Sequence, residues 1–291
     1  MDPNKNTTKE AKVSIIMNCY NGDRFLAEAI NSVLSQTYTN WEIIFWDNQS
    51  TDESAKIFQS YPDPRLKYYQ SEAHTNLSKA RKNAISKSTG EYVAFLDVDD
   101  LWYSNKLSTQ LAEFQDPDVD VVYSNYNVKN EKNQNVYIQY KENQLHDGHI
   151  TSQLLKKNFV NLLTLVSRKS SISSIKNIFP NDLAFSCDYD FVIKISFYFK
   201  FKCIKKPLGN YRIHNRNDSI PKWHHVRELQ TMYQNLKNEK IMQTFGEAVS
   251  FKLVIERTKI NYIKHKIKNS WIKKFLKNKP LIKNTLFHAS N

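Results

Sequence analysis

The chain has 291 residues, enough for one large domain or a domain with an appendage, and its 40% hydrophobic and 24% charged residues exclude an intrinsically disordered protein. The formal net charge is +13, and the excess lies near the C-terminus, where residues 251–283 carry eleven Lys or Arg against the single acid Glu256. A basic chain can bind nucleic acid, but no zinc-finger or RNP-like motif is present, so no nucleic acid is expected as a partner.

The cysteines and the hydropathy pattern indicate in which cellular compartment the protein works. Cys19, Cys187 and Cys203 are odd in number, far apart and without CxxC spacing, which argues against a disulfide framework and a zinc site. Residues 1–12 are polar, and no later run approaches the roughly 18 apolar residues of a membrane span. We therefore expect a cytoplasmic protein that is neither secreted nor membrane-spanning.

Strand and helix patterns alternate along the first hundred residues. Apolar runs at 13–20, 41–47, 66–70 and 91–100 predict four strands, separated by helical patterns at 24–36, from about 53, and at 77–90. Ser50 and Glu53 have the spacing of a capping box at the start of the second helix, and Gly90 is expected to end the third. This order predicts a mostly parallel sheet with helices on both faces.

Polar residues follow three of these strands, at 18–24, 47–52 and 97–100. Ligands of such sheets bind beyond the carboxyl ends of the strands, so the three clusters predict one site. Within the third cluster, strand periodicity places Asp97 and Asp99 on one face. A Mg²⁺ or Mn²⁺ ion with phosphate oxygens in its shell would relieve the repulsion between these carboxylates. An acidic turn or a helix N-cap is an equally good interpretation of the motif alone.

An ordered set of motifs gives the chain a resemblance to a known family. The stretches at 13–54 and 80–100 resemble the nucleotide-binding half of family 2 glycosyltransferases: a strand, an Asn-Gly turn, a helix ending in SQT, an acidic strand end before STD, an Ala-Arg helix and a terminal DxD. The likeness is close over roughly residues 12–125. It implies an α/β fold of the GT-A type, with a Rossmann-like, mostly parallel sheet flanked by helices.

The resemblance also implies roles for the residues of the donor site. Asp47 would recognise the nucleobase, usually uracil, with Asn48 beside it, although this chain has DNQSTD where DDGSTD is common. The nucleoside pocket would be lined by Asn18, Tyr20 and Asn21. Arg81 would approach the ribose or diphosphate, but a solvated helix face is its alternative. Asp97 would lie near the sugar or ribose, Asp99 would bind Mn²⁺ or Mg²⁺, and Asp100 would cap the next helix.

The second half would supply the acceptor site and the base. Residues 119–128 predict a strand, and 135–140 its hairpin partner. The segment 185–196 resembles the family's Glu-Asp-Tyr-Asp helix start, so Asp188 is implied as the general base, with Asp190 as the competing candidate and Cys187 in place of the Glu. Arg212 and His214 match a loop that approaches the diphosphate or metal, and that loop, with Arg216, is expected to close over the donor.

The last part of the chain predicts two basic helices, at 226–245 and 249–276. The second interleaves apolar residues, among them Trp271, Phe275 and Leu276, with Lys. Such helices bind anionic membrane surfaces, here the inner face of the cell membrane, or pack on the catalytic domain with a solvated Lys face. We expect a catalytic domain at 1–220, with a nucleotide-binding half at about 12–125 and an acceptor half at about 126–220. A basic helical C-terminal extension at 221–291 would follow it.

Together these features predict a metal-dependent inverting glycosyltransferase. It would move a sugar from a nucleotide-sugar donor, first of all a UDP-sugar, to a glycan or lipid-linked sugar acceptor in surface polysaccharide synthesis. A sugar nucleotidyltransferase would need an N-terminal glycine-rich loop, and a phosphatase would need its DxD after the first strand; both are missing here. A catalytically inactive relative that acts as a binding protein remains a further alternative.

Overall fold

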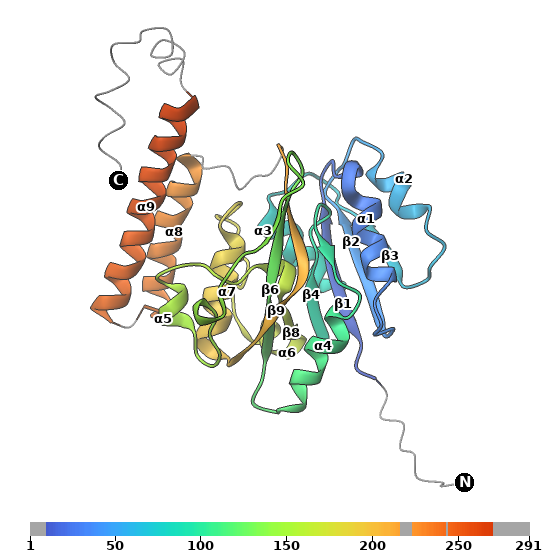
Figure 1. The fold of residues 1–291 in the computed structure, drawn as a ribbon, viewed down its shortest axis with the longest axis horizontal. Coiled ribbons are helices and arrows are strands. Elements are labelled where there is room, and N and C mark those ends of the chain that lie inside the picture. Colours follow the sequence, from blue (N-terminus) through green and yellow to red (C-terminus); the bar gives the residue numbers. More distant parts are fainter. Residues whose placement is uncertain (1–9, 216–222, 243, 270–291) are drawn as a thin grey trace.

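A computed structural model describes residues 10–215, 223–242 and 244–269 of the chain (Figure 1). Within these residues the strands form a nine-stranded sheet with the order β3-β2-β1-β4-β8-β6-β9-β5, and β7 pairs with the outer part of β6. The strands are β1 (Val13–Cys19), β2 (Trp41–Asp47), β3 (Leu66–Gln70), β4 (Tyr92–Phe95), β5 (Leu101–Trp102), β6 (Val121–Asn130), β7 (Val136–Ile138), β8 (Val166–Arg168) and β9 (Phe201–Ile213).

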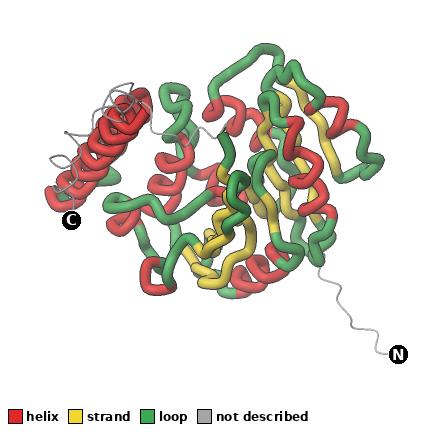
Figure 2. Tube along the Cα trace, turned by 45° about the horizontal axis from the view of Figure 1, so that its top comes forward, coloured by secondary structure: helices red, strands yellow, loops and turns green. Residues whose placement is uncertain are grey.

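The predicted α/β architecture is confirmed in the first half of the sheet. Strands β3, β2, β1 and β4 are all parallel, and their register sets Cys19 at the end of β1 opposite Asp47 at the end of β2. The connecting helices are α1 (Asp23–Leu34), α2 (Ser54–Gln59) and α3 (Leu77–Ser86). Crossovers between parallel strands are right-handed. The chain moves from β1 to β2 and β3 through α1 and α2, and α3 then leads back to β4 on the other side of β1. Because this last crossover runs in the opposite direction, α3 covers the opposite face of the sheet from α1 and α2. Figure 2 shows the strands running between helices.

The second half of the sheet is mixed. Strand β8 is antiparallel to both β4 and β6, whereas β6 and β9 are parallel and interrupted by irregularities around Asn125. The predicted hairpin of β6 and β7 is confirmed. The helices of this half are α4 (Lys106–Ala112), α5 (Thr151–Leu154), α6 (Lys169–Ser174) and α7 (Cys187–Tyr198), with 3-10 turns at Glu113–Gln115, Glu142–Gln144 and Leu162–Thr164.

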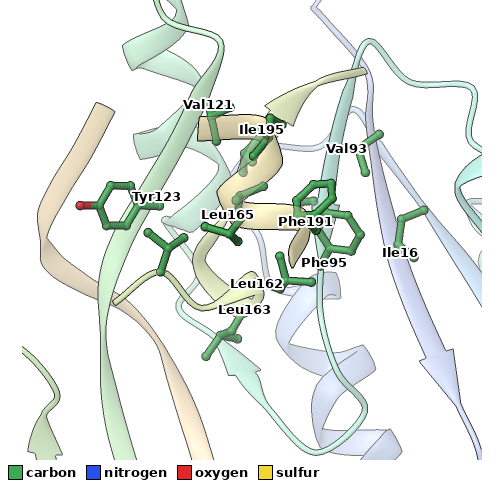
Figure 3. Packing of buried hydrophobic residues seen from close by; sticks show 14 of the residues in the cluster. Ile16, Val93, Phe95, Val121, Tyr123, Leu162, Leu163, Leu165, Phe191 and Ile195 are labelled. Carbon is green, nitrogen blue, oxygen red and sulfur yellow. The ribbon is translucent and has the colours of Figure 1, made fainter. Parts of the chain in front are cut away.

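The hydrophobic core joins the two halves beneath the strand ends (Figure 3). Phe95 of β4 meets Phe191 of α7 edge to face, with ring centroids 5.5 Å apart, and Phe191 stacks on Phe179 at 4.8 Å. Burying each of these rings contributes about 1.5–3 kcal/mol. This packing fixes the start of α7 next to the end of β4, so residues about ninety positions apart in sequence come together there.

Two local predictions of helix ends are wrong. Ser50 and Glu53 form no capping box; the backbone N–H of Ser54 instead donates to Asp52 Oδ1 at 3.0 Å. Helix α3 ends at Ser86, four residues before Gly90. A Cβ atom at Gly90 would lie 2.6 Å from the carbonyl oxygen of Lys12, so this glycine is required by the close approach of the neighbouring strand β1 rather than by a helix end.

The C-terminal region consists of α8 (Trp223–Asn238) and α9 (Phe245–Asn269), which lie side by side (Figure 1). Their buried side chains pack on α5 and α7: the fully buried Phe251 ring lies 6.2 Å from the Tyr233 ring and 5.9 Å from the Tyr189 ring. Within the described ranges, every helix is too short or too polar to cross a membrane. Trp271, Phe275 and Leu276, which the sequence placed on the second helix, lie outside the described residues.

Candidate active site

A cleft of about 1140 Å³ opens at the carboxyl ends of β1, β2 and β4. Nine of the site residues predicted from the sequence line it: Asn18, Tyr20, Asn21, Asn48, Arg81, Asp97, Asp99, Asp188 and His214. They come from six separate parts of the chain: the ends of β1, β2, β4 and β9, and the helices α3 and α7. Asp47 and Arg212 do not line the cleft.

Asp47 lies beneath the cleft floor with no exposed surface. Its Oδ1 accepts the backbone N–H of Ser50 at 2.7 Å, and its Oδ2 accepts the Tyr68 hydroxyl at 2.7 Å. Both carboxylate oxygens therefore already bind groups that shape the loop after β2. The expectation that Asp47 itself touches a nucleobase does not fit this position.

The loops after β1 and β2 are joined to each other. Asn21 Oδ1 accepts the backbone N–H of Thr51 at 2.8 Å, and the N–H of Asn21 donates to Ser50 Oγ at 3.1 Å. Both Asn21 and Gln49 have left-handed backbone, with φ of 53° and 70°. Gln49 stands at the glycine position of the common DDGSTD motif, so the chain keeps that turn at a cost of about 1–2 kcal/mol.

The other predicted donor contacts form one end of the cleft. The Asn48 amide binds the backbone and hydroxyl of Thr75, which fixes the loop before α3. Tyr20, about half exposed, lies against the His74 ring with centroids 4.3 Å apart. The buried Nδ2 atom of Asn18 has no hydrogen-bond partner within the described chain, so it is a donor available to a ligand. His74 was not predicted, because no motif singled it out.

Arg81 is the central charge of the cleft and is only 2% exposed. Its guanidinium donates to Asp97 Oδ1 at 3.1 Å, forms an ion pair with Asp188 Oδ1, and donates to Cys187 Sγ at 3.5 Å. A buried guanidinium is stable only when it is paired, and two carboxylates pair this one. The predicted solvated helix face for Arg81 is therefore wrong, and the residue joins the end of β4 to the start of α7.

Asp188 and Asp190 have different surroundings. The Asp188 side chain is 36% exposed and lines the cleft. Asp190 is fully buried on another side of α7, where Lys194 Nζ lies 3.0 Å from its Oδ2 and 3.0 Å from Glu239 Oε1. Burial raises the pKa of Asp190 to about 7, partly offset by Lys194. Asp190 thus serves to hold α7 against the end of α8, and only Asp188 can meet a ligand in the cleft.

Asp99 and His214 form the acidic edge of the cleft, with His214 Nε2 2.9 Å from Asp99 Oδ2. Burial, and then the nearby Asp97 charge, raises the pKa of Asp99. Arg212 supports this edge from below: its Nε donates to the Asp99 carbonyl oxygen at 2.9 Å and its Nη2 to Glu28 at 2.8 Å. Arg212 thus supports the backbone at Asp99 and does not itself line the cleft.

Asp100 does not cap a helix as expected. It is 1% exposed, and its Oδ1 accepts the backbone N–H of Arg212 at 2.8 Å, which ties the end of β4 to β9. Burial raises its pKa well above the ordinary value. Residues 216–219 of the predicted closing loop, Arg216 among them, lie outside the described residues.

The donor set of Asp99 and His214 fits a divalent cation only in part. A carboxylate oxygen and an imidazole nitrogen suit Mn²⁺, and the two converge on one point of the cleft. In the described part of the chain, no group of three or more acidic, His or Cys side chains is arranged to hold a metal by itself. Oxygens of a diphosphate would have to complete the shell, which is the usual arrangement for Mg²⁺ at phosphate sites.

The side of the cleft opposite the strand ends, its far wall, contains residues that were not predicted from the sequence. It is formed by aromatic, aliphatic and neutral polar side chains from β6, β9, α7, α8, the loop before α7 and the segment before the 3-10 turn Leu162–Thr164: Tyr126, Asn161, Phe185, Ser186, Tyr189, Tyr211, His225 and Leu229. The contribution of α8 could not be predicted, because it depends on how the C-terminal helices pack.

Comparison with solved structures supports this description of the fold. The crystal structure of Staphylococcus aureus TarS 1–349 in complex with UDP-GlcNAc matches with a TM-score of 0.63 at 19% identity, covering 93% of this chain and 77% of that one. The mannosyltransferase PcManGT from Pyrobaculum calidifontis, in complex with GDP-Man and Mn²⁺, matches with a TM-score of 0.61 at 17% identity, covering 90% and 77%. This likeness shows that the chain has the GT-A fold.

Sequence comparison identifies the family. The model of glycosyl transferase family 2 matches residues 14–170, and the chain belongs to this family. The UDP-Glc:α-D-GlcNAc-diphosphoundecaprenol β-1,3-glucosyltransferase WfgD of Escherichia coli is 36% identical over 118 residues, which are 40% of this chain and 47% of that enzyme. TuaG of Bacillus subtilis, named for teichuronic acid biosynthesis, is 27% identical over 242 residues, 79% of this chain and 90% of that one. The chain thus matches less than half the length of the Escherichia coli enzyme.

Proposed function

We propose that this glycosyltransferase moves a sugar from a UDP-sugar to a hydroxyl group of a glycan or lipid-linked acceptor, with inversion and with a divalent cation, in surface polysaccharide synthesis. The observation that carries the proposal is the Arg81 ion-pair network, which brings the strand-end carboxylate Asp97 and the cleft-lining Asp188 to one guanidinium. The structures of TarS in complex with UDP and with UDP-GlcNAc support a UDP-sugar donor. The name of WfgD, which includes a diphosphoundecaprenol-linked sugar, supports a lipid-linked acceptor.

The donor would lie along the β1, β2 and β4 ends. Tyr20 and His74 offer a ring surface for the base, and Asn18 Nδ2 offers it a hydrogen bond. Asp99 and His214 would hold Mn²⁺ or Mg²⁺, which supplies charge neutralisation to the diphosphate leaving group. Asp97, held by Arg81, would meet the ribose or the transferred sugar.

Asp188 would act as the base. As the acceptor oxygen bonds to the anomeric carbon, the bond to the diphosphate oxygen breaks with its electron pair, and Asp188 takes the acceptor's hydroxyl proton. The ion pair with Arg81 orients the carboxylate for this transfer. If the acceptor attacks from the side of Asp188 and the diphosphate leaves on the side of the proposed metal ligands Asp99 and His214, the configuration of the sugar is inverted.

Two further parts of the proposal concern the C-terminal region. We propose the boundary near residue 220 between catalytic domain and basic extension, and association of α9 with the anionic inner face of the cell membrane. Four exposed apolar side chains, Val249, Leu253, Ile260 and Ile263, share one side of α9. Lys252 and Lys264 flank this side. The exposed Glu256, which pairs with Lys259, lies on the same side. An otherwise apolar stripe with basic flanks is typical of helices that lie on anionic lipid.

The decisive experiment is thermal unfolding with UDP, GDP, CDP or dTDP, each with and without Mn²⁺. A nucleotide at 100 times its Kd should stabilise the protein by about 2.7 kcal/mol, and we expect this shift for UDP only with the metal. Asp99→Asn should abolish the metal-dependent shift, while Asp118→Asn, at an exposed carboxylate paired with Lys200, should leave it unchanged. Stabilisation by no nucleotide would instead favour an inactive relative.

A further inference from the structure

The loop before α7 is held by a carboxylate from α8. Glu228 accepts three consecutive backbone N–H groups, from Ala184 at 3.0 Å to Oε1, and from Phe185 at 2.8 Å and Ser186 at 2.7 Å to Oε2. Charge-assisted hydrogen bonds of this kind are the strong ones, and a carboxylate at a helix N-terminus also interacts favourably with the helix dipole. Glu228 therefore determines the conformation of residues 184–186.

This loop carries side chains that face the cleft. Phe185 is 41% exposed, lines the cleft and stacks on His224 with ring centroids 4.1 Å apart. Two residues beyond Ser186 stands Asp188. From α8 itself, His225 and Leu229 line the same wall. The loop and α8 thus form one surface next to the proposed base.

The chemistry of this surface indicates what it binds. Its side chains are aromatic, aliphatic or neutral polar, whereas Arg24 and Arg81, which also line the cleft, come from α1 and α3. Partly exposed aromatic rings bind the apolar faces of sugar rings, whereas phosphate groups are bound by Arg and Lys. The wall therefore suits an uncharged sugar ring rather than a phosphate group of the acceptor.

We infer that Glu228 is a positioning residue of the transfer reaction: by holding residues 184–186 it sets Phe185 as the platform for a neutral acceptor sugar and directs the acceptor hydroxyl to Asp188. The inference rests on the proposed function and extends it to the acceptor side.

The helix α8 does not depend on Glu228 for its place. Val226, Met232 and Leu236 are fully buried, and the Lys194 ion pair with Glu239 fixes its end to α7. Removal of the Glu228 charge should therefore release the loop and leave the helix packed. This separation makes the role of Glu228 testable in a folded protein.

The test compares wild type with Glu228→Gln, and with Glu256→Gln as a matched control on the exposed face of α9. The donor is UDP-glucose or UDP-GlcNAc with Mn²⁺, and the acceptors are neutral alkyl glycosides and a sugar diphosphate on a short alkyl chain. For Glu228→Gln we expect kcat/KM for the acceptor to fall about tenfold to a hundredfold, as for a misplaced reactant, while the UDP-induced thermal shift stays as in wild type. Amide exchange at residues 184–186 should become faster.

The outcomes separate the two proposals. If wild type shows no UDP shift and no transfer, the proposed function fails. If wild type is active and Glu228→Gln transfers with wild-type acceptor kinetics, the positioning role is wrong even when amide exchange has changed. Phe185→Ala should raise the acceptor KM without changing the donor KM, and equal losses for both substrates would also contradict the platform.

Discussion

At the scale of single residues, the buried charges organise this protein. Arg81 was predicted from its motif to be near the donor, but its pairing with Asp188, 107 positions later, is a property of the fold and could not be predicted from spacing. The strand-end clusters, in contrast, could be predicted, because the ends of parallel strands must meet at one edge. Asp47 shows the limit of the motif: the carboxylate is present, but it is fully buried and accepts hydrogen bonds from Ser50 in the following loop and from Tyr68 of β3.

Glu42 is a second buried charge, and it has a structural role. Its carboxylate, 3% exposed, accepts hydrogen bonds from Lys12, Ser14 and Thr89. Burial alone would raise the pKa of Glu42, but these partners outweigh it and lower the pKa below the ordinary value. We expect Glu42→Gln to lower the free energy of unfolding by about 2–3 kcal/mol at pH 7.

The pH dependence of this difference follows from the lowered pKa. The contribution of Glu42 is complete above the unfolded-state pKa of about 4.3 and is lost as the pH falls through the lower folded-state value. Urea unfolding at pH 7 and at pH 3.5 should therefore show a smaller difference between wild type and Glu42→Gln in acid. Glu53→Gln, at an exposed ion pair, is the control; a pH-independent difference at Glu42 would contradict the assigned role.

At the scale of elements, periodicity predicted the strands and helices of the first hundred residues and the β6–β7 hairpin, but not β8 or β9, and the local signals for two helix ends failed. Gly90 was predicted to end a helix because glycine is frequent at that position. The structure shows that a glycine is required there because the backbone at the start of β1 leaves no space for a side chain. The start of α2 likewise depends on Asp52 rather than on the Ser50 and Glu53 pair. Signals shared by several turn types cannot be assigned before the neighbouring strand is known.

We expect Gly90→Ala to destabilise the protein by about 1–3 kcal/mol, because its Cβ would lie 2.6 Å from the Lys12 carbonyl oxygen and 2.7 Å from the Ser14 nitrogen. Gly246→Ala is the contrasting change: it lies in α9 with its nearest neighbour at 3.9 Å and should stabilise by about 0.5–1 kcal/mol. Thermal unfolding of both variants tests this. Similar behaviour of the two glycines would exclude the close approach as the reason for Gly90.

At the scale of the whole molecule, the sequence separated a catalytic part from a basic extension, but the structure packs α8 against α7 and into the wall of the cleft. A composition change shows where a chain alters its surface, not where its contacts end, which is why the cleft residues of α8 could not be predicted. The basic composition is visible on the exposed surface of α9, which includes Lys252 and Lys264.

The membrane proposal belongs to this scale. We expect sedimentation with vesicles that contain anionic phospholipid, weakened by salt, and little with neutral vesicles. The double variant Leu253→Gln/Ile260→Gln should reduce binding about tenfold or more, since each half-exposed side chain would lose about 1 kcal/mol of apolar burial. Val136→Gln/Ile138→Gln, equally exposed on β7, should bind as wild type. Equal loss in both variants would mean that α9 has no special part.

The contact between Asp99 and His214 also bears on how the enzyme would respond to its surroundings. Under the proposed function, these two side chains hold the cation and the diphosphate of the nucleotide completes its shell, so each must raise the affinity for the other by the same factor. Occupancy of the donor site then follows the product of the two concentrations, and a scarce cation is compensated by abundant nucleotide sugar. The rate of sugar transfer in the cell would report metal supply and sugar-nucleotide supply as a single quantity.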